Sequence, residues 1–422
     1  KGAPIRPAIL WIDRRSEAEC IWLKHEIGLE KCARISGNQI DPYFGGPKFL
    51  WFRNNEPTHF EKTKKILLGG NYVVYHLTGK FVADHSVAGL CAPCYDLKKK
   101  QWSEEICEAM QLPIELLPEL HESHEVIGEI TTEASEKTGL KKGIPVVTGG
   151  GDFACSTLGV GVIEEGEACA MYGTAGNILM PLNAPLFDTR LLNTNHVVKN
   201  RYLTLGSIYA GGVLQWFRNT LGDFEGIEAR KIGSSIYEIL DAQTSEVEAG
   251  CDGLIFLPYL MGERTPIWDI YARGVYLGIT PYHTKPHMYR AVLEGIGFAL
   301  NHIIDIITTL GIHIKEIAAV NGGAKSKLWR QIISDIMGIP QIYISETGGA
   351  PLGDAILAGI GCNIFRDAKI VKDWIPEGER TEPIPDNQRK YEPYYKFFRS
   401  TYKILKENFA LLFKIVKKNK EI

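Results

Sequence analysis

The chain has 422 residues, of which 45% are hydrophobic and 23% are charged, and these proportions are typical of a folded globular protein. Its formal net charge of -3 at pH 7 argues against a general attraction to nucleic acid. No apolar run reaches the roughly 18 residues that a membrane span needs, so we expect no membrane partner.

Nine cysteines are scattered along the chain, which argues against a disulfide framework and for a reducing compartment, the cytoplasm. Cys91 and Cys94 form a single CxxC motif. Because no second CxxC or nearby His pair accompanies it, we interpret the motif as ordinary core packing and not as a zinc site.

Short apolar segments alternate with helical patterns, beginning with the expected strand at 144–149, which ends in glycine. Residues 167–182 predict a hairpin of two strands around a Gly-Thr-Ala-Gly turn. A long helix is predicted over 284–311, because apolar residues recur at helical spacing between Thr284 and Gly311. A second buried strand follows at 316–322. This alternation predicts an α/β fold.

The length predicts two or three domains. The best boundary lies near residue 148, where the charged segment 136–143 gives way to a strand and glycines. The division is therefore predicted as 1–147 and 148–422, and the second domain ends in a helical tail that includes the amphipathic segment 409–416.

The segment 146–161, VVTGGGDFACSTLGVG, places three glycines directly before Asp152. Glycines after a strand permit unusual backbone angles and close approach of a ligand. Asp152 would then be a carboxylate held at the end of a sheet. The alternative is that Asp152 caps the helix that follows, since Asp is a preferred N-cap residue.

Two further glycine-rich turns occur in the second half of the chain. MYGTAGN, residues 171–177, offers backbone N–H groups and the Thr174 hydroxyl to phosphate oxygens. In 319–338 a strand ends at Gly322 and Gly323 and a helix begins after Ser326, an arrangement that favours anion or nucleotide binding.

With these motifs the chain resembles the FGGY family of carbohydrate kinases, most closely its xylulokinase-like branch. The resemblance runs in order over nearly the whole chain, through the segments 6–20, 41–51, 102–120, 146–161, 172–177, 209–218, 256–269, 272–280, 321–338 and 348–361.

The resemblance implies two RNase H-like domains that flank a cleft, as in actin and the heat-shock ATPases. It also implies ATP-dependent phosphorylation of a sugar hydroxyl, with a ketopentose such as xylulose as the favoured substrate and Mg²⁺ accompanying ATP. Asp152 matches the family's catalytic carboxylate. It is the expected general base, and Mg²⁺ is expected near it.

On the nucleotide side, the resemblance assigns phosphate contacts to Gly173 and Thr174. Gly211 and Gln215 match the start of a helix on the nucleotide side. The remaining matches are Gly323, expected against the adenosine, with Ala324 beside it, and Lys327, at a position where glycerol kinases carry an adenine-contacting Asn.

On the sugar side, the resemblance assigns Trp11, Asp13, Tyr43, Asp152 and Phe153. A carboxylate such as Asp13 suits polyol recognition, because it accepts hydrogen bonds from hydroxyls. Core packing for Trp11 and a loop aromatic for Tyr43 are the alternatives.

The sequence departs from the family pattern at two places. Phe153 follows Asp152 where relatives carry Asn or Gln, which leaves the identity of the sugar open. The N-terminal Asp-x-Gly-Thr phosphate and magnesium loop has no counterpart, so the N-terminal domain is expected to lack its first strands and this chain alone is expected to turn over poorly.

Other functions stay open. The substrate could be glycerol, gluconate, ribulose or erythritol, or the chain could be a catalytically lapsed actin-like protein that binds a sugar or nucleotide. A homodimer is a further expectation. Glu263 and Arg264 are interpreted as a structural ion pair.

Overall fold

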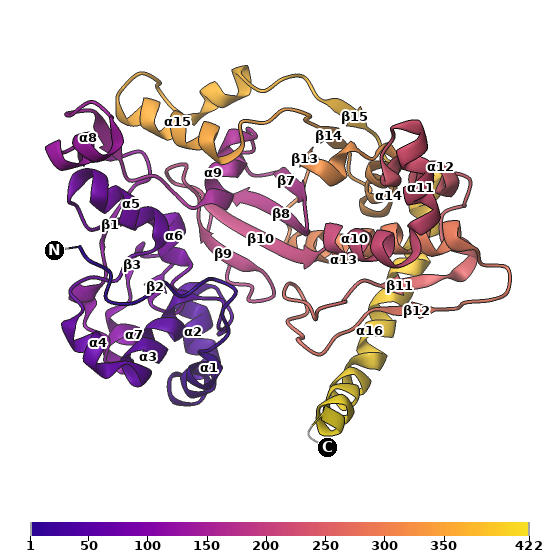
Figure 1. Cartoon of the computed structure of the whole chain (residues 1–422), viewed down its shortest axis with the longest axis horizontal. Coiled ribbons are helices and arrows are strands. Elements are labelled where there is room, and N and C mark those ends of the chain that lie inside the picture. Colours follow the sequence, from indigo (N-terminus) through magenta and orange to yellow (C-terminus); the bar gives the residue numbers. More distant parts are fainter. Residues whose placement is uncertain (1, 421–422) are drawn as a thin grey trace. The chain divides into compact units, whose positions relative to one another are not determined.

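The structure is a computed structural model that describes residues 2–420, and these divide into two compact units (Figure 1). The first unit comprises the chain up to Glu165, then Met180–Thr204 and Thr347–Ile375. The second comprises Gly166–Leu179, Leu205–Glu346 and the chain from Pro376. Both units are discontinuous in sequence, whereas the predicted boundary near residue 148 gives two continuous segments. That boundary stays a prediction.

The first unit is mainly helical, with short strands paired two by two. Its helices and short helical turns are α1 (Glu17–Trp22), a π-helical turn (Leu23–Gly28), α2 (Leu29–Ser36), α3 (Gly45–Asn55), α4 (Pro57–Lys62), α5 (Gly69–Thr78), α6 (His85–Gly89), α7 (Glu104–Ala109), a 3₁₀ turn (Ile114–Leu116), α8 (Thr132–Thr138), α9 (Asp152–Gly159), α15 (Gly349–Gly361) and a 3₁₀ turn (Ala368–Asp373). Its strands are β1 (Val82–Asp84), β2 (Tyr95–Asp96), β3 (Gln101–Trp102), β4 (Glu119–His121), β5 (Val126–Glu129), β6 (Pro145–Val147) and β9 (Leu192–Asn195).

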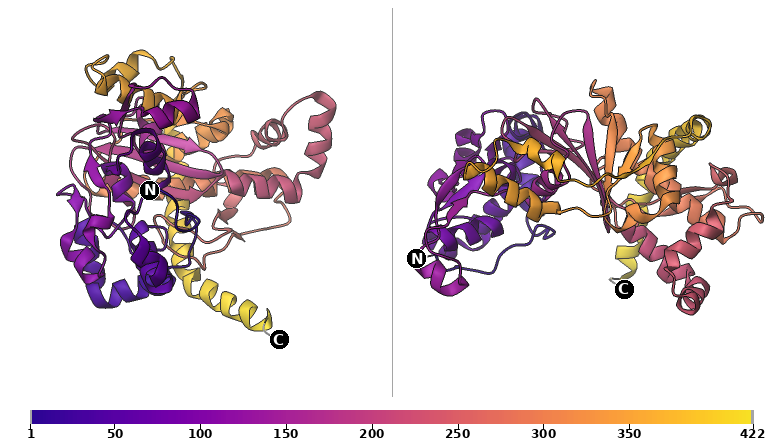
Figure 2. Two further views of the ribbon diagram at one scale, coloured as in Figure 1. Left: turned by 60° about the vertical axis from the view of Figure 1, so that its left-hand side comes forward. Right: turned by 90° about the horizontal axis from the view of Figure 1, so that it is seen from above.

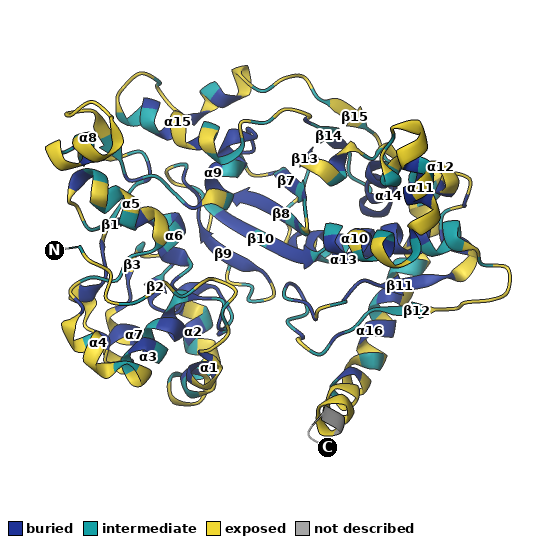
Figure 3. Ribbon diagram, in the orientation of Figure 1, coloured by how far each residue is buried: buried dark blue, intermediate teal, exposed yellow. Residues whose placement is uncertain are grey.

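In the first unit β1 pairs with β4 in parallel, and β5 pairs with β6 in antiparallel fashion. Cys91 and Cys94 are fully buried in the main apolar cluster of this unit, together with Leu23, Cys32 and Ile106. Both cysteines therefore pack in the core. Figure 3 colours the buried parts of the chain dark blue.

A seven-stranded sheet follows the order β15-β14-β13-β7-β8-β10-β9, and its strands β7, β13, β14 and β15 lie wholly in the second unit. The sheet strands are β7 (Glu167–Tyr172), β8 (Ala175–Leu182), β10 (Tyr202–Tyr209), β13 (Glu316–Val320), β14 (Gln341–Tyr343) and β15 (Glu379–Thr381). β13 pairs in parallel with β7 and β14, and the predicted hairpin is confirmed as antiparallel β7 and β8. The fold is therefore α/β, as predicted.

The remaining elements of this unit are helical apart from one short strand pair. They are α10 (Gly211–Leu221), α11 (Asp223–Ile232), α12 (Ile236–Thr244), a 3₁₀ turn (Cys251–Gly253), β11 (Ile255–Leu257), β12 (Val275–Leu277), α13 (Lys285–Thr309), a 3₁₀ turn (Gly322–Lys325), α14 (Lys327–Met337) and α16 (Pro385–Lys420). Figure 2 shows α16, in yellow, as a long helix that ends close to the C-terminus.

Helix α13 is the core helix of the second unit, and it confirms the predicted long helix with Thr284 as its N-cap residue. It is long and apolar enough to cross a membrane by composition, but 78% of its most apolar window is buried inside the protein. Such burial is that of a helix in a protein core.

Candidate active site

The Gly149–Gly151 turn links β6 to α9, and two features of it favour glycine, a backbone angle and close packing. Gly149 has φ 75°, in the left-handed region that favours glycine. A Cβ on Gly150 would lie 2.3 Å from Cγ1 of Val197, and a Cβ on Gly151 would lie 2.7 Å from the ring of Phe153. Close packing within the first unit therefore excludes side chains at both positions.

Backbone hydrogen bonds anchor this turn at several points. The N–H of Thr148 donates to the carbonyl of Glu125 at 3.0 Å, and the N–H of Gly149 donates to the carbonyl of Ser123 at 3.0 Å. The N–H of Gly151 donates to Oγ of Ser86 at 2.9 Å. The residue that follows the turn is thus fixed by contacts from two separate segments, Ser123–Glu125 and the one that contains Ser86.

Asp152 is the first residue of α9 and is exposed. The helix N-cap is Gly151, and Oδ1 of Asp152 accepts a hydrogen bond at 2.8 Å from the N–H of Phe153. Asp152 therefore does not occupy the N-cap position that the alternative interpretation requires. Its carboxylate lies in the first turn of α9.

The predicted sugar-side residues Trp11 and Tyr43 lie together in the first unit. Their ring centroids are 5.8 Å apart with the rings edge to face. Nζ of Lys48 donates to the carbonyls of Trp11 at 3.1 Å and Tyr43 at 3.0 Å. Because Trp11 is 60% exposed, the core-packing alternative for it is wrong.

Asp13 lies two residues beyond Trp11 and is held by Arg15. Its carboxylate accepts hydrogen bonds from the Arg15 guanidinium at 2.7 and 3.0 Å and from the Arg15 N–H at 2.9 Å. These hydrogen bonds lower the pKa of Asp13 to about 2. The carboxylate is therefore ionised and can accept hydrogen bonds from hydroxyls across the physiological pH range.

In the second unit, the predicted phosphate-contacting residues converge on one turn. Gly173 and Thr174 join β7 to β8, and their carbonyls accept hydrogen bonds at 3.0 Å from the N–H groups of Gly211 and Gly212. A Cβ on Gly211 would lie 2.3 Å from the carbonyl oxygen of Gly173. The first residues of α10 thus pack directly on the β7–β8 turn, and Thr174 is exposed at its tip.

Gly323 joins this group through Tyr172, the last residue of β7. A Cβ on Gly323 would lie 2.9 Å from both the Cβ and the carbonyl oxygen of Tyr172. Ala324 follows and is fully buried. Gln215 is exposed on α10, the helix that packs against the same turn.

Lys327 is the first residue of α14, and its side chain is 81% exposed. Its Nζ lies 3.2 Å from Oε1 of Glu379. The ammonium group is thus placed at the end of the turn that contains Gly323 and is already engaged by a carboxylate.

Comparison with known proteins decides the family. The N-terminal domain model of the FGGY family of carbohydrate kinases matches residues 1–159, and the C-terminal domain model of the same family matches residues 168–362. The chain belongs to the FGGY family of carbohydrate kinases.

Individual relatives of this carbohydrate kinase agree with the family models. The xylulose kinase of Staphylococcus xylosus is 31% identical over 407 residues, which is 95% of this chain and 82% of the relative. The structure of xylulose kinase from Rhodospirillum rubrum has a TM-score of 0.88 at 29% identity and covers 96% of this chain and 81% of that chain. Gluconate kinase from Lactobacillus acidophilus has a TM-score of 0.88 at 27% identity, with 96% and 80% covered.

The enzyme is accordingly a two-domain sugar kinase that uses ATP as phosphate donor. The residues that the resemblance assigned to the sugar lie in the first unit, and those assigned to the nucleotide lie in the second. The structure brings Trp11 together with Tyr43, and Gly173 and Thr174 together with Gly211.

A Mg²⁺ ion would have to be held partly by the nucleotide. In residues 2–420 no group of three or more His, Cys, Asp or Glu side chains is arranged to hold a metal ion. Mg²⁺ commonly binds through one or two carboxylates together with substrate phosphates. The exposed carboxylate of Asp152 fits such a partial ligand.

The sequence suggested a structural ion pair for Glu263 but not the backbone contacts that its carboxylate makes. Its buried carboxylate accepts hydrogen bonds from the N–H groups of Tyr209 at 3.0 Å and Arg264 at 2.9 Å. Burial raises the pKa of Glu263 to about 7. Because Tyr209 ends β10 just before α10, Glu263 helps to fix the start of the helix that carries Gly211.

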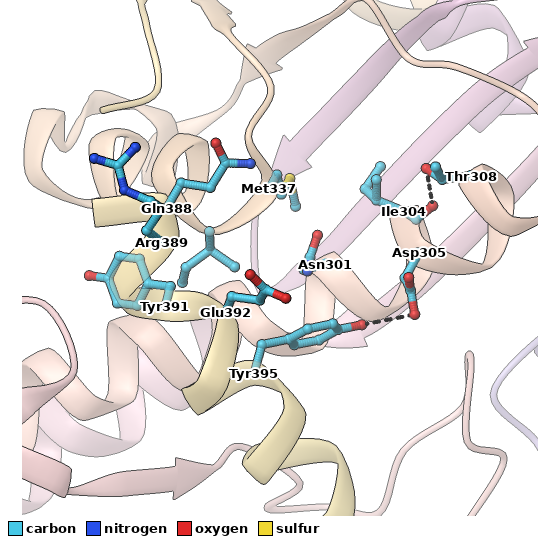
Figure 4. Close-up of a pocket in the computed structure, with 11 residues that line it drawn as sticks. Asn301, Ile304, Asp305, Thr308, Met337, Gln388, Arg389, Tyr391, Glu392 and Tyr395 are labelled. Carbon is cyan, nitrogen blue, oxygen red and sulfur yellow. Dashed lines mark hydrogen bonds between the residues drawn. The ribbon is translucent and has the colours of Figure 1, made fainter. Parts of the chain in front are cut away.

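The second unit also contains a cavity of about 330 Å³ between α13, α14 and α16 (Figure 4). It is lined by Asn301, Ile304, Asp305, Thr308, Ile336, Met337, Gln388, Arg389, Tyr391, Glu392 and Tyr395. None of the predicted sugar-side or nucleotide-side residues is among them. The carboxylate of Asp305 is occupied by the hydroxyl of Tyr395 and the guanidinium of Arg399. The cavity is therefore separate from the candidate active site.

Proposed function

We propose that this kinase transfers the γ-phosphate of ATP to a hydroxyl of a ketopentose such as xylulose, with Asp152 as the general base. The observation that carries the proposal is the placement of Asp152. An exposed carboxylate follows a turn that is anchored by Glu125, Ser123 and Ser86, and it accepts a hydrogen bond from the N–H of Phe153.

In the proposed reaction the carboxylate of Asp152 accepts the proton of the sugar hydroxyl as that oxygen attacks the γ-phosphorus. Phosphoryl transfer depends mostly on positioning and charge stabilisation, so a single base on a fixed turn is sufficient. Mg²⁺, when bound with ATP, supplies neutralisation of the phosphate charge. The proposed phosphate contacts are the exposed hydroxyl of Thr174 and the backbone around Gly173. The other proposed nucleotide contacts are Gly211, Gln215, Gly323, Ala324 and Lys327.

The test of the base is Asp152→Asn in the full-length protein. General base catalysis is worth roughly 10²–10⁴ in rate, so kcat should fall by that factor while the KM for the sugar changes little. Asp223→Asn is a matched control, because Asp223 is also an exposed first residue of a helix with a glycine N-cap. Near-normal kcat in Asp152→Asn would disprove the assignment.

The sugar is proposed from the relatives, which include xylulose kinases and a gluconate kinase. ADP release measured with xylulose, ribulose, gluconate, glycerol and erythritol would rank the candidates. We expect the highest kcat/KM with xylulose. A clear preference for gluconate or glycerol would replace the ketopentose proposal while keeping the kinase.

Two further points accompany the proposal. Trp11, Asp13, Tyr43 and Phe153 are proposed to line the sugar site, with Asp13 accepting hydrogen bonds from hydroxyls. A cytoplasmic location and assembly as a homodimer stay predictions, and sedimentation of the purified protein would test the second.

A further inference from the structure

A fully buried carboxylate lies behind the turn that carries Asp152. Asp84 is the last residue of β1 and the N-cap residue of α6, and it is 0% exposed. Its carboxylate accepts hydrogen bonds from the N–H of Ser86 at 2.7 Å, the N–H of Val87 at 3.3 Å and the hydroxyl of Ser123 at 3.1 Å. Burying a carboxylate is costly unless several donors satisfy it, and these donors do so.

Ser86 and Ser123, which donate to Asp84, also accept hydrogen bonds from the Gly149–Gly151 turn. Oγ of Ser86 accepts the N–H of Gly151 at 2.9 Å, and the carbonyl of Ser123 accepts the N–H of Gly149 at 3.0 Å. The hydroxyl of Ser86 also hydrogen-bonds to the carboxyl of Asp84. An ionised carboxylate can only accept, so Asp84 directs the Ser86 proton toward itself and leaves a lone pair of that oxygen for Gly151.

Capping of α6 does not account for these contacts. A cap requires only the two N–H groups at the start of the helix, those of Ser86 and Val87. The hydroxyl of Ser123, on a separate segment, and the link through Ser86 to Gly151 lie outside that role.

We propose that Asp84 is a positioning residue for the kinase reaction, which through Ser86 and Ser123 fixes the Gly149–Gly151 turn and so the carboxylate of Asp152. This inference rests on the proposed role of Asp152 as general base. Asp84 does not contact the substrate in this scheme and acts only through the turn.

Protonation of Asp84 would weaken this arrangement. Burial raises the pKa of Asp84 to about 6, and the hydrogen bonds from Ser86 and Ser123 offset part of that effect. When the carboxyl takes up a proton, it becomes a donor that competes for the serine oxygens. The kcat should therefore fall as pH falls through about 6.

Other titratable groups surround Asp84. His121 of β4 stands opposite it in the β1–β4 register, His85 follows it on α6, and Tyr95 of β2 and Cys155 of α9 are close enough to interact electrostatically with it. His121 pairs with Glu119 and Glu125. His121→Gln is therefore the control for the pH profile and should keep the fall in kcat near pH 6.

The decisive variants are Ser86→Ala and Ser86→Thr in the full-length kinase. Misplacement of a catalytic group by about 1 Å costs up to about 10²-fold, so Ser86→Ala should lower kcat by about 10- to 100-fold with the KM for ATP and sugar little changed. Ser86→Thr keeps a hydroxyl and should recover most of kcat. Asp84→Asn should lower kcat similarly and abolish the fall near pH 6, provided that it folds.

A double variant separates this proposal from the proposed function. Ser86→Ala added to Asp152→Asn should cause little further loss of kcat, because both act through the same carboxylate. Wild-type kcat in folded Ser86→Ala, or equal losses in Ser86→Ala and Ser86→Thr, would overturn the role of Asp84 even when Asp152→Asn lowers kcat. An unaffected Asp152→Asn would instead overturn the proposed base.

Discussion

Replacing Gly150 by alanine tests whether the turn before Asp152 is fixed by close packing. The added Cβ would lie 2.3 Å from Cγ1 of Val197 and 3.0 Å from Sγ of Cys155. Carbon atoms normally approach to about 3.5–4.0 Å, so Val197 or the turn must move by more than about 1 Å. Val197 and Cys155 are both buried and have little room to yield.

Overpacking of this kind costs about 1–3 kcal/mol in unfolding free energy. A displacement of about 1 Å two residues before Asp152 should also lower kcat by up to about 10²-fold. Urea unfolding and steady-state kinetics on Gly150→Ala would measure both quantities.

Two other glycines serve as controls. Gly149→Ala has open space around the added Cβ and φ 75°, so it should cost about 1–2 kcal/mol through backbone strain and affect kcat less. Gly70→Ala, on the exposed start of α5, also has open space and should gain about 0.5–1 kcal/mol. If Gly150→Ala behaved like Gly70→Ala in both assays, the packing explanation would be refuted.

Three predictions concern the second unit. Gly211→Ala should weaken ATP binding, because the added Cβ meets a backbone carbonyl of the β7–β8 turn at 2.3 Å, whereas Gly322→Ala has open space and should not, as ATP titrations would show. Burial raises the pKa of Glu263 from 4.5 to about 7, so the folded state holds a proton that the unfolded state releases, and this contribution to stability is lost as pH rises from about 4.5 to 7. Glu263→Gln should remove about 3 kcal/mol of that pH dependence in unfolding measurements at pH 5 and 8, and an unchanged slope would contradict the burial argument. Lys327→Ala breaks only an exposed pair with Glu379 and should change stability by less than about 1 kcal/mol, while a KM for ATP that stays constant would exclude the proposed nucleotide contact.

The elements with strong local signals could be predicted from the sequence. Thr284 and the apolar repeat after it gave the start and course of α13, because capping and helical periodicity act within a few residues. The β7–β8 hairpin was equally clear from its Gly-Thr-Ala-Gly turn. The family resemblance assigned Asp152 as the base and Gly173 and Gly211 as nucleotide contacts. These assignments stay proposals, and they agree with the exposure of Asp152 and the packing of Gly211 on Gly173.

Contacts between distant segments could not be predicted. The sequence around Gly150 contains nothing that indicates Val197, and the link from Gly151 to Ser86 joins residues 65 positions apart. The carboxylate of Glu263 likewise reaches Tyr209 across 54 positions. Such partners depend on how segments pack in three dimensions, which local patterns do not encode.

The discontinuous division of the chain has a consequence for biosynthesis. The first unit needs α15, which lies within Thr347–Ile375, and α15 packs on α9, the helix that begins at Asp152. A ribosome that has made residues up to 165 has therefore not yet supplied the partner of that helix. The first unit can be completed only after Gly166–Leu179 and Leu205–Glu346 of the second have been synthesised, and neither unit can be produced as one uninterrupted polypeptide by cutting the gene at a single point.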